Sequence, residues 1–378
     1  MERAPAPLGT PLRRAHVEID LPSLAGNLTR LRNDAGVGRR IFAVVKGDAY
    51  GAGLVPCSKA LERAGVDALA VGNADDAVTL RAAGIGCDIL VYGSTPPERA
   101  PELAGIDAIL TIHDVASMQA IQSAACQRDG PVRVMVKVDC GLARLGVAMR
   151  DLEQVFASLA EAGAIAVEGI YTHLAGQQSP ERVAEQGAKL ALACEIAASH
   201  GVSPALRMLA SSRVILEHPA LNLTAIDPGR LVFGLARHDW DVGHDYAPVI
   251  ARFTARIVQV SDVPKGTIPY GSDRPVERDL RVAVVAAGTA DGLVFTQPGQ
   301  PVLVRGSRAR QLGGPGIEHS MLDLSDVPMA RVGDEVTYFG RDGADEITPL
   351  DFARLCGRPI DQVIPLVGRL ARRTYRAN

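Results

Sequence analysis

A lysine that ends an apolar strand pattern is the residue of this chain best suited to chemistry. The run IFAVV at 41–45 leads directly to Lys46, and Tyr50 follows four residues later between small residues. A lysine amine at the end of a strand can face a pocket and bond covalently to a carbonyl compound. The alternative is a solvated lysine whose stem alone packs on apolar surface. The rest of the chain decides between these two interpretations.

Five later segments also carry residue types that suit catalysis or anion binding. They are VKVDCGLARLG at 136–146, GIYTHL at 169–174, LASS at 209–212, DPGRLVFG at 227–234 and PYG at 269–271. Together with the lysine segment they resemble, in the same order, the motifs of the alanine racemase family. Six ordered matches make chance agreement implausible. The resemblance implies an eight-fold (β/α) barrel that binds pyridoxal 5'-phosphate as its cofactor.

The resemblance implies a cofactor site, residue by residue. Lys46 matches the lysine that bonds to the cofactor and then serves as a base on one face of the substrate Cα. Tyr50 matches a tyrosine on the cofactor phosphate, and His173 matches a histidine beside the cofactor ring. Their alternatives are a half-buried core tyrosine and a buried, hydrogen-bonded histidine. The phosphate cradle is completed by Ser212, Gly229 and Arg230, since consecutive amides form an anion nest and glycine admits close approach.

Racemisation also requires a second acid/base group on the opposite face of the substrate. Tyr270 matches the tyrosine in this role, which in the family reaches into the barrel of the partner subunit, so the resemblance implies a homodimer with shared sites. Arg144 matches an arginine that approaches the substrate carboxylate, and such a cation can lower the pKa of a phenol. A surface arginine is the alternative. Lys137 matches a lysine that many members carry carbamylated, and we expect it beside the substrate as well.

Asp227 is the largest departure from the family pattern, because the family places an arginine against the pyridine nitrogen. An arginine cannot accept the pyridinium proton, whereas a carboxylate can. Asp227 therefore favours a protonated ring that stabilises a carbanion at Cα. Barrel-type decarboxylases that share this fold also place an acidic residue there. The alternative is an aspartate that caps the following Pro-Gly turn and points elsewhere.

Residues around the expected substrate entrance also differ from the family. Ala52 replaces a histidine, Thr289 replaces a tyrosine, and Ile317 with Glu318 stands for a Met-Asp pair. Gln362 replaces an entrance tyrosine in a weaker alignment. Because two aromatic walls are lost, we expect Thr289 and Ile317 to border a site for an amino acid larger or more polar than alanine.

Three functions are compatible with these residues. The first is a pyridoxal-phosphate-dependent amino-acid racemase or epimerase with Lys46 and Tyr270 as its two bases. The second is another carbanion reaction on an amino acid, such as decarboxylation, aldol-type cleavage or transamination, which Asp227 favours. The third is a non-catalytic cofactor-binding protein, against which the retained Tyr270 and Arg144 argue.

The frame that must position these residues is an α/β pattern. Strand patterns occur at 41–46, 68–72, 88–92, 108–112, 132–139, 166–173, 206–210 and 223–226, and helical patterns at 54–64, 75–83, 114–126, 152–162 and 181–200. This alternation predicts parallel strands with crossover helices, most simply a closed eight-fold barrel of the TIM type. The active sites of such barrels lie at the carboxyl ends of the strands. Five candidates fall at or just beyond such an end, namely Lys46, Arg144, His173, Ser212 and Gly229.

The last third of the chain changes character. Val- and Thr-rich strand patterns occur at 252–260, 280–286, 301–304 and 335–339, separated by Gly and Pro. We therefore expect a barrel at 14–245 and a mostly β domain at 246–378, with residues 1–13 as candidates to join the second domain.

Composition narrows the class of protein. The chain has 378 residues, of which 47% are hydrophobic and 22% are charged, and its formal net charge is -3. This predicts a globular enzyme with no basic face for nucleic acid. The small amino-acid substrate is what the family resemblance implies. No apolar run reaches the ~20 residues of a membrane span, and the first residues lack a signal peptide's apolar stretch, so we expect a cytoplasmic protein. The six cysteines lack metal-ligand spacing, and no metal is expected.

Overall fold

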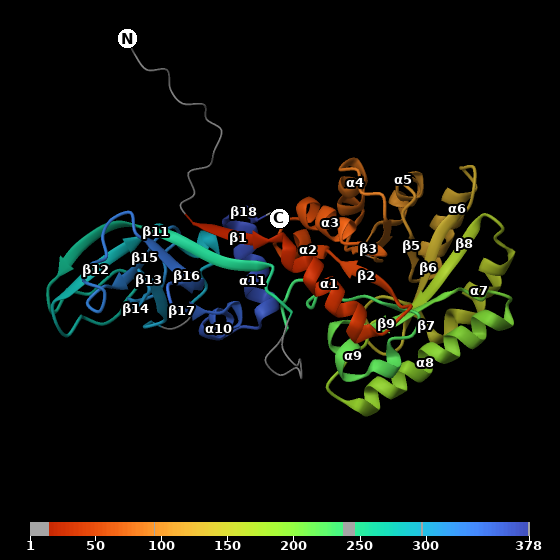
Figure 1. Cartoon of the computed structure of the whole chain (residues 1–378). Coiled ribbons are helices and arrows are strands. Elements are labelled where there is room, and N and C mark those ends of the chain that lie inside the picture. The colour runs from red at the N-terminus through yellow and green to blue at the C-terminus, as the bar shows by residue number, and fades with distance from the viewer. Residues whose placement is uncertain (1–14, 94, 237–245, 296–297, 377–378) are drawn as a thin grey trace, which may run out of the picture. The chain divides into compact units, whose positions relative to one another are not determined.

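The structure is a computed structural model and describes residues 15–93, 95–236, 246–295 and 298–376. The chain divides into two compact units. One unit spans residues 21–249, and the other combines the residues up to 20 with those from 250 onward. Figure 1 labels the helices and strands of both units along the chain.

Eight parallel strands form the core of the first unit. They are β2 (Arg40–Val44), β3 (Ala68–Val71), β4 (Asp88–Val91), β5 (Leu110–Ile112), β6 (Val132–Asp139), β8 (Ile165–Tyr171), β9 (Leu206–Ala210) and β10 (Ala225–Ile226). Their order is β4-β3-β2-β10-β9-β8-β6-β5. A parallel bridge between Leu90 and Ile109 joins the two ends of this order and nearly closes the ring. The eight-fold barrel expected from the sequence is thereby confirmed.

The barrel helices follow the expected alternation with the strands. They are α1 (Leu21–Ala35), α2 (Lys46–Tyr50), α3 (Leu54–Arg63), α4 (Ala74–Ala82), α5 (Ala100–Gly105), α6 (Val115–Ala125), α7 (Leu152–Glu161), α8 (Pro180–Ser199) and α9 (Ser212–Glu217). Short 3-10 turns occur at η1 (Pro97–Arg99), η2 (Met149–Asp151) and η3 (Pro219–Leu221), and β7 (Val147–Ala148) pairs with β6. In Figure 1 the longer helices lie outside the strands. Across the described ranges, no helix has both the length and the apolar character to cross a membrane.

Local chemistry explains why these helices begin where they do. Asp114 accepts a hydrogen bond from the Ser117 amide at 2.7 Å, while the Ser117 hydroxyl approaches the Asp114 amide, which forms a capping box at the start of α6. Such caps satisfy amides that have no partner within the helix. The apolar face of α6 is then buried against the barrel through Met118 and Ile121.

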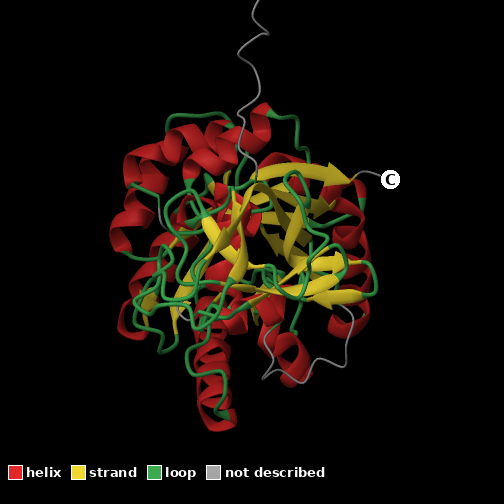
Figure 2. Ribbon diagram, turned by 90° about the vertical axis from the view of Figure 1, so that its left-hand side faces the viewer, coloured by secondary structure: helices red, strands yellow, loops and turns green. Residues whose placement is uncertain are grey.

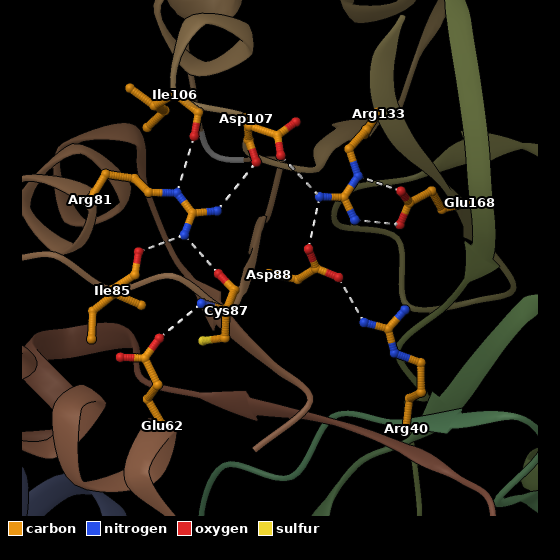
Figure 3. Close-up of polar contacts among 10 residues, drawn as sticks. All are labelled: Arg40, Glu62, Arg81, Ile85, Cys87, Asp88, Ile106, Asp107, Arg133 and Glu168. Atoms are coloured by element: carbon orange, nitrogen blue, oxygen red, sulfur yellow. Dashed lines mark hydrogen bonds and ion pairs between the residues drawn. The ribbon is translucent and has the colours of Figure 1, made fainter. Parts of the chain in front are cut away.

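The amino ends of the barrel strands are joined by ion pairs (Figure 3). Arg133 of β6 bonds to Asp88 of β4 at 2.8 Å and to both carboxylate oxygens of Glu168 of β8. Asp88 also accepts a bond of 2.7 Å from Arg40 of β2. Burial works to raise the pKa of Asp88, but the two guanidinium groups outweigh it and the net shift is downward. This network lies at the end of the barrel opposite to the one where active sites are found.

The second unit is built on a nine-stranded sheet with the order β17-β16-β13-β14-β15-β12-β11-β1-β18. Its strands are β1 (His16–Asp20), β11 (Ile250–Val263), β12 (Leu280–Val285), β13 (Pro301–Val304), β14 (Ser307–Gln311), β15 (Ser320–Asp323), β16 (Glu335–Asp342), β17 (Asp345–Ile347) and β18 (Arg372–Arg376). Turn η4 (Thr289–Asp291) and helices α10 (Pro349–Leu355) and α11 (Ile360–Leu370) complete it. Figure 2 draws the strands in yellow and the helices in red. The expected mostly β domain is confirmed.

The first described strand lies outside the barrel, although the expected barrel range began at residue 14. β1 pairs with β11 in antiparallel and with β18 in parallel orientation. Val17 and Ile19 are fully buried in this sheet, in strict alternation with partly exposed neighbours. The barrel unit begins at Leu21, the first residue of α1, and ends at Val249.

Candidate active site

Backbone hydrogen bonds bring the carboxyl ends of neighbouring barrel strands together. The Val44 amide donates to the Pro228 carbonyl at 2.9 Å, and the Asp227 amide donates to the Ala210 carbonyl at 3.1 Å. The segments that carry Lys46, Asp227 and Ser212 are therefore neighbours across β2, β10 and β9. The structure thus gathers three expected site segments at one mouth of the barrel.

Lys46 begins a turn of unusual backbone geometry. Gly47, Asp48 and Ala49 all have left-handed helical dihedrals, and φ of Tyr50 is 52°. L-residues avoid this region because Cβ approaches the following carbonyl. The turn is held by a 2.7 Å bond from the Leu54 amide to Asp48 Oδ1. It leaves the side chain of Lys46 exposed at the end of β2.

Tyr50 packs against the segment that follows β10. Its ring centre lies 5.1 Å from that of Phe233. A Cβ atom added at Gly229 would overlap the Tyr50 hydroxyl, so glycine is required for this approach. The structure therefore brings Tyr50 and Gly229 together.

Ser212 joins the same group of residues from α9. Its hydroxyl oxygen accepts hydrogen bonds from the amides of Gly229 at 3.1 Å and Leu231 at 3.3 Å. Ser212 is buried, and Arg230 lies between the two amides in the chain. A hydroxyl and a run of amides thus converge between β9 and β10, which is the arrangement an anion-binding cradle requires.

Arg144 is carried by a loop that folds back on β6. Asp139 Oδ1 accepts hydrogen bonds from the amides of Gly141 and Leu142 at 2.9 Å and of Ala143 at 3.1 Å. Three amides on one carboxylate fix the loop immediately before the arginine. The side chain of Arg144 is exposed.

His173 lies two residues beyond β8. Burial, together with the neighbouring cations of Lys46 and Arg144, lowers its pKa to about 3. Lys137 and Arg230 act in the same direction. A histidine with this pKa is neutral at physiological pH, so it can lie beside other cations of the site without repelling them.

Asp227 is a buried carboxylate with one open oxygen. It is 6% exposed, and its Oδ2 atom accepts a bond of 3.0 Å from the Tyr92 hydroxyl. In the described part of the chain Oδ1 is buried without a hydrogen-bond partner. Burial raises the pKa of Asp227 to about 7, while Tyr92, Lys46 and Lys137 oppose that rise. An open, buried acceptor of this kind calls for a donor from a ligand.

Two tyrosines of the site were not among the predicted residues. Tyr92 follows β4, and Tyr171 ends β8, where it is fully buried. The amine of Lys137, itself 4% exposed, lies near the faces of both rings. The sequence signal that could have identified these two tyrosines is their position at the carboxyl ends of strand patterns, where the active sites of barrels form.

The remaining predicted residues lie in the second unit. Tyr270 is 63% exposed and Ile317 is 72% exposed. Both border a surface hollow with Gly316 and Glu318, and a Cβ at Gly316 would contact the Tyr270 ring. The Thr289 amide donates to the Gly316 carbonyl at 2.8 Å. The structure thus brings Tyr270, Ile317 and Thr289 into one region of this unit.

Both units match domains of one known family. Residues 19–237 match the family model described as alanine racemase, N-terminal domain, and residues 250–375 match alanine racemase, C-terminal domain. A curated alanine racemase from Sorangium cellulosum is 34% identical over 97% of this chain and 100% of its own length. One from Methanococcus maripaludis is 29% identical over 95% of this chain and 97% of its own.

Solved structures give the same result. The alanine racemase of the D-cycloserine producer Streptomyces lavendulae is 27% identical and superposes with a TM-score of 0.89, covering 98% of both chains. The alanine racemase of Bacillus anthracis with bound L-Ala-P is 27% identical, with a TM-score of 0.88 over 98% of this chain and 97% of its own.

Proposed function

The chain belongs to the alanine racemase family and is an amino-acid racemase of that type, and from this premise we propose a two-base, pyridoxal-phosphate-dependent reaction on an amino acid other than alanine. The observation that carries the proposal is the convergence of Lys46, Tyr50, His173, Ser212 and Asp227 at the carboxyl end of one barrel. These residues come from different strands, and each supplies a group that the reaction needs.

The residues of the barrel mouth fit pyridoxal phosphate on two counts. The buried, open Oδ1 of Asp227 would accept the proton of the ring nitrogen. The glycine at 229 leaves room for close approach of an anion beside the hydroxyls of Tyr50 and Ser212. The residues that would hold the group are Lys46 at its carbonyl carbon, Tyr50, Ser212, Gly229 and Arg230 at its phosphate, and His173 at its ring.

When bound, pyridoxal phosphate supplies a sink for the electron pair left at Cα after the proton departs. The amine of Lys46 takes the α-proton from one face of the substrate, which breaks the Cα–H bond. Tyr270 of the partner subunit gives its phenolic proton to the other face, which forms the new Cα–H bond. After the turnover the Lys46 ammonium gives its proton to water and the Tyr270 phenolate takes one from water, so both groups regain their starting forms. In the reverse direction Tyr270 takes the α-proton and Lys46 supplies the new one. Arg144 holds the substrate carboxylate between the two bases.

The partner subunit is part of this proposal because Tyr270 stands exposed on the second unit. A homodimer whose sites are shared would cover that side chain and deliver its hydroxyl to a barrel. Isologous pairing of two identical chains produces two such sites at once.

The proposed substrate is larger or more polar than alanine. Thr289 and Ile317 stand where the family has a tyrosine and a methionine, and Ala52 where it has a histidine. The exposed position of Ile317 and Thr289 beside Tyr270 supports a role at the substrate entrance.

One observation favours a second candidate, a one-base carbanion reaction such as decarboxylation or side-chain cleavage. The carboxylate of Asp227 at the ring nitrogen would strengthen the cofactor as an electron sink, which these reactions need more than racemisation does. Tyr270 would then be dispensable for proton removal by Lys46.

The test is an incubation of the holoenzyme with single-enantiomer amino acids in deuterated water, in which deuterium at Cα and chirality are followed together. We expect exchange with inversion, faster on a non-alanine substrate than on alanine. Exchange with retention, or loss of carboxylate or side chain, would support the second candidate. Preferred turnover of alanine would contradict the substrate proposal alone.

The variant Tyr270→Phe sharpens this test, since it removes one hydroxyl from an exposed side chain. For a two-base racemase we expect exchange to persist with one enantiomer only, from the Lys46 face. Equal loss with both enantiomers would argue against Tyr270 as the second base.

A further inference from the structure

A tyrosine that has no step in the proposed reaction is bonded to the buried carboxylate of the barrel mouth. Tyr92 follows β4, and its hydroxyl donates a hydrogen bond of 3.0 Å to Asp227 Oδ2. Asp227 is 6% exposed, and among the described residues its other oxygen, Oδ1, is buried without a hydrogen-bond partner. The two oxygens of this carboxylate therefore have different surroundings, and only Oδ1 is open to a ligand.

Hydrogen bonds across the seam between β4 and β5 hold Tyr92 in place. The Thr111 hydroxyl of β5 donates to the carbonyl of Val91, the residue before Tyr92, at 2.8 Å. This bond uses the only hydroxyl proton of Thr111, so in the 2.9 Å contact between Thr111 and the Tyr171 hydroxyl the donor is Tyr171. The proton of Tyr171 is thus directed to Thr111, whereas that of Tyr92 is directed to Asp227.

The Tyr92 hydroxyl keeps its proton over the pH range in which Asp227 titrates. Burial holds the pKa of Tyr92 well above its ordinary value, and the neighbouring charge of Asp227 acts in the same direction. A carboxylate oxygen can only accept a hydrogen bond, so an ionised Asp227 always finds a donor in this phenol.

Burial and this hydrogen bond act on Asp227 in opposite directions. Burial disfavours the charged carboxylate, and the pKa of Asp227 is raised to about 7. The hydrogen bond from Tyr92 is the largest influence that opposes the rise, followed by the charges of Lys46 and Lys137. A donor to the charged form of an acid favours that form.

We propose that Tyr92 is the positioning residue of Asp227, whose hydroxyl occupies Oδ2, leaves Oδ1 for the ring nitrogen of the cofactor and favours the ionised carboxylate. The inference deepens the proposed function and rests on it for the cofactor. Without a donor on Oδ2 the carboxylate would be a stronger base, and a proton shared with the ring nitrogen would move toward the carboxyl. The unprotonated ring would be the weaker electron sink.

A tyrosine that only packs is the competing interpretation. The ring of Tyr92 lies 6.0 Å from that of Tyr171, and this contact does not need the hydroxyl. Tyr92→Phe keeps the ring and removes the hydroxyl alone. A packing role predicts at most a change in stability, whereas the positioning role predicts a change in the proton affinity of another residue, Asp227.

The first measurement titrates Asp227 in the full-length, cofactor-free protein by ¹³C NMR with labelled aspartate carboxyl groups, and Asp227→Asn identifies its signal. Tyr92→Phe should raise the pKa of Asp227 by about one to two units, since it removes a hydrogen bond to a charged group. Tyr171→Phe is the matched control, because it removes a neighbouring hydroxyl that donates to Thr111, and should leave this pKa near its native value. No shift in Tyr92→Phe, or equal shifts in both variants, would overturn the proposal.

Should Tyr92→Phe fail to fold, 3-fluorotyrosine introduced at position 92 alone keeps both the ring and the hydroxyl. Fluorine makes the phenol a stronger hydrogen-bond donor, so the pKa of Asp227 should then fall. A pKa that rises or stays unchanged would contradict the proposal.

The second measurement uses the protein loaded with pyridoxal phosphate that carries ¹⁵N in its ring, because the ¹⁵N chemical shift separates a protonated from an unprotonated pyridine. We expect the protonated position in the native chain and in Tyr171→Phe, and a move toward the unprotonated position in Tyr92→Phe and Asp227→Asn. A signal that moves in Asp227→Asn but not in Tyr92→Phe would overturn the proposal. Neither measurement depends on turnover, so a failure of the racemase assay in deuterated water is distinguishable from a failure of this inference.

Discussion

Single residues in the barrel mouth have pKa values that burial moves in opposite directions. The histidine at 173 loses its proton early, with a pKa near 3, whereas the carboxyl of Asp227 holds its proton to about pH 7. Both shifts reflect the cost of charge in a buried site. As a result, His173 is neutral at physiological pH, whereas Asp227 changes its protonation state near that pH.

Removing the carboxyl of Asp227 should change how stability depends on pH in the cofactor-free protein. In the folded chain Asp227 stays protonated up to about pH 7, whereas its ordinary pKa is 3.8, so its contribution to stability falls as the pH rises between these values. His173 acts oppositely, because the folded chain does not bind the proton that the unfolded chain takes up below 6.5. The variant Asp227→Asn removes the contribution of the carboxyl and leaves that of His173. Its free energy of unfolding should therefore rise more steeply with pH than that of the native chain.

Urea unfolding at several pH values between about 4 and 6.5 measures this slope. Each unit of pKa difference corresponds to about 1.4 kcal/mol, so the change is well above experimental error. His173→Gln is the matched control and should make stability fall with rising pH over the same interval. Parallel profiles for the native chain and Asp227→Asn would contradict the raised pKa of Asp227.

At the scale of elements, the turn α2 departs most from local preference. Asp, Ala and Tyr adopt left-handed dihedrals in sequence, at a cost of about 1–2 kcal/mol per residue. Of these residues only aspartate has a side chain that tolerates the region and bonds to nearby backbone. The 2.7 Å bond from the Leu54 amide to Asp48 therefore links the strained turn to the start of α3.

Replacing Asp48 should weaken this turn and, with it, the placement of Lys46. Asp48→Ala removes the acceptor and puts a second alanine in a left-handed conformation, so we expect a loss of about 1–2 kcal/mol in the free energy of unfolding. Pyridoxal phosphate should also bind more weakly. Asp48→Asn keeps the oxygen acceptor and tolerates the dihedrals, and should retain most of both properties. Equal loss in the two variants would show that the acceptor is unimportant.

The ion pairs at the opposite end of the barrel should contribute to stability and not to catalysis. Arg133→Met leaves the carboxylates of Asp88 and Glu168 without their shared partner, and both are about three-quarters buried. We expect a loss of about 2–4 kcal/mol in the free energy of unfolding, with kcat unchanged in the folded fraction. Arg150→Met removes an exposed pair with Asp151 in the same unit and should cost less than about 0.5 kcal/mol. Similar losses for both variants would refute the distinction.

The elements differ in how far the sequence predicts them. The barrel strands were predicted within a few residues, because strands buried on both faces read as continuous apolar, β-branched runs. The segment after Lys46 gave no signal for its left-handed turn, since three L-residues with positive φ run against backbone preference. Within the barrel mouth, the segments that carry Lys46, Ser212 and Asp227 are neighbours, and their roles stay predictions. Tyr92 was missed because its hydroxyl donates to a carboxylate 135 residues away.

At the scale of the whole molecule, the division between the units does not follow the order of the chain. β1 near the beginning pairs with β18 near the end, so the sheet of the second unit contains both. A single strand pattern of five residues cannot reveal a partner more than 350 residues distant in sequence. The sequence range of the barrel therefore began too early, at residue 14 rather than at Leu21.

Sharing of the site between subunits gives the sharpest prediction at this scale. Lys46→Ala removes the base that the barrel provides, and Tyr270→Phe removes the hydroxyl that the second unit provides, so each variant alone should be inactive as a racemase. If the two groups of a site come from different chains, a mixed dimer holds one site with both groups intact. Random exchange of subunits in an equal mixture should then restore about a quarter of native activity.

The measurement is racemase activity of the two variants before and after joint unfolding and refolding, with each variant refolded alone as the control. Restored activity requires that Lys46 of one chain meet Tyr270 of another, because no chain in the mixture carries both. A site built within one chain would leave the mixture as inactive as its components. The outcome thus decides whether the exposed tyrosine of the second unit serves its own barrel or that of its partner.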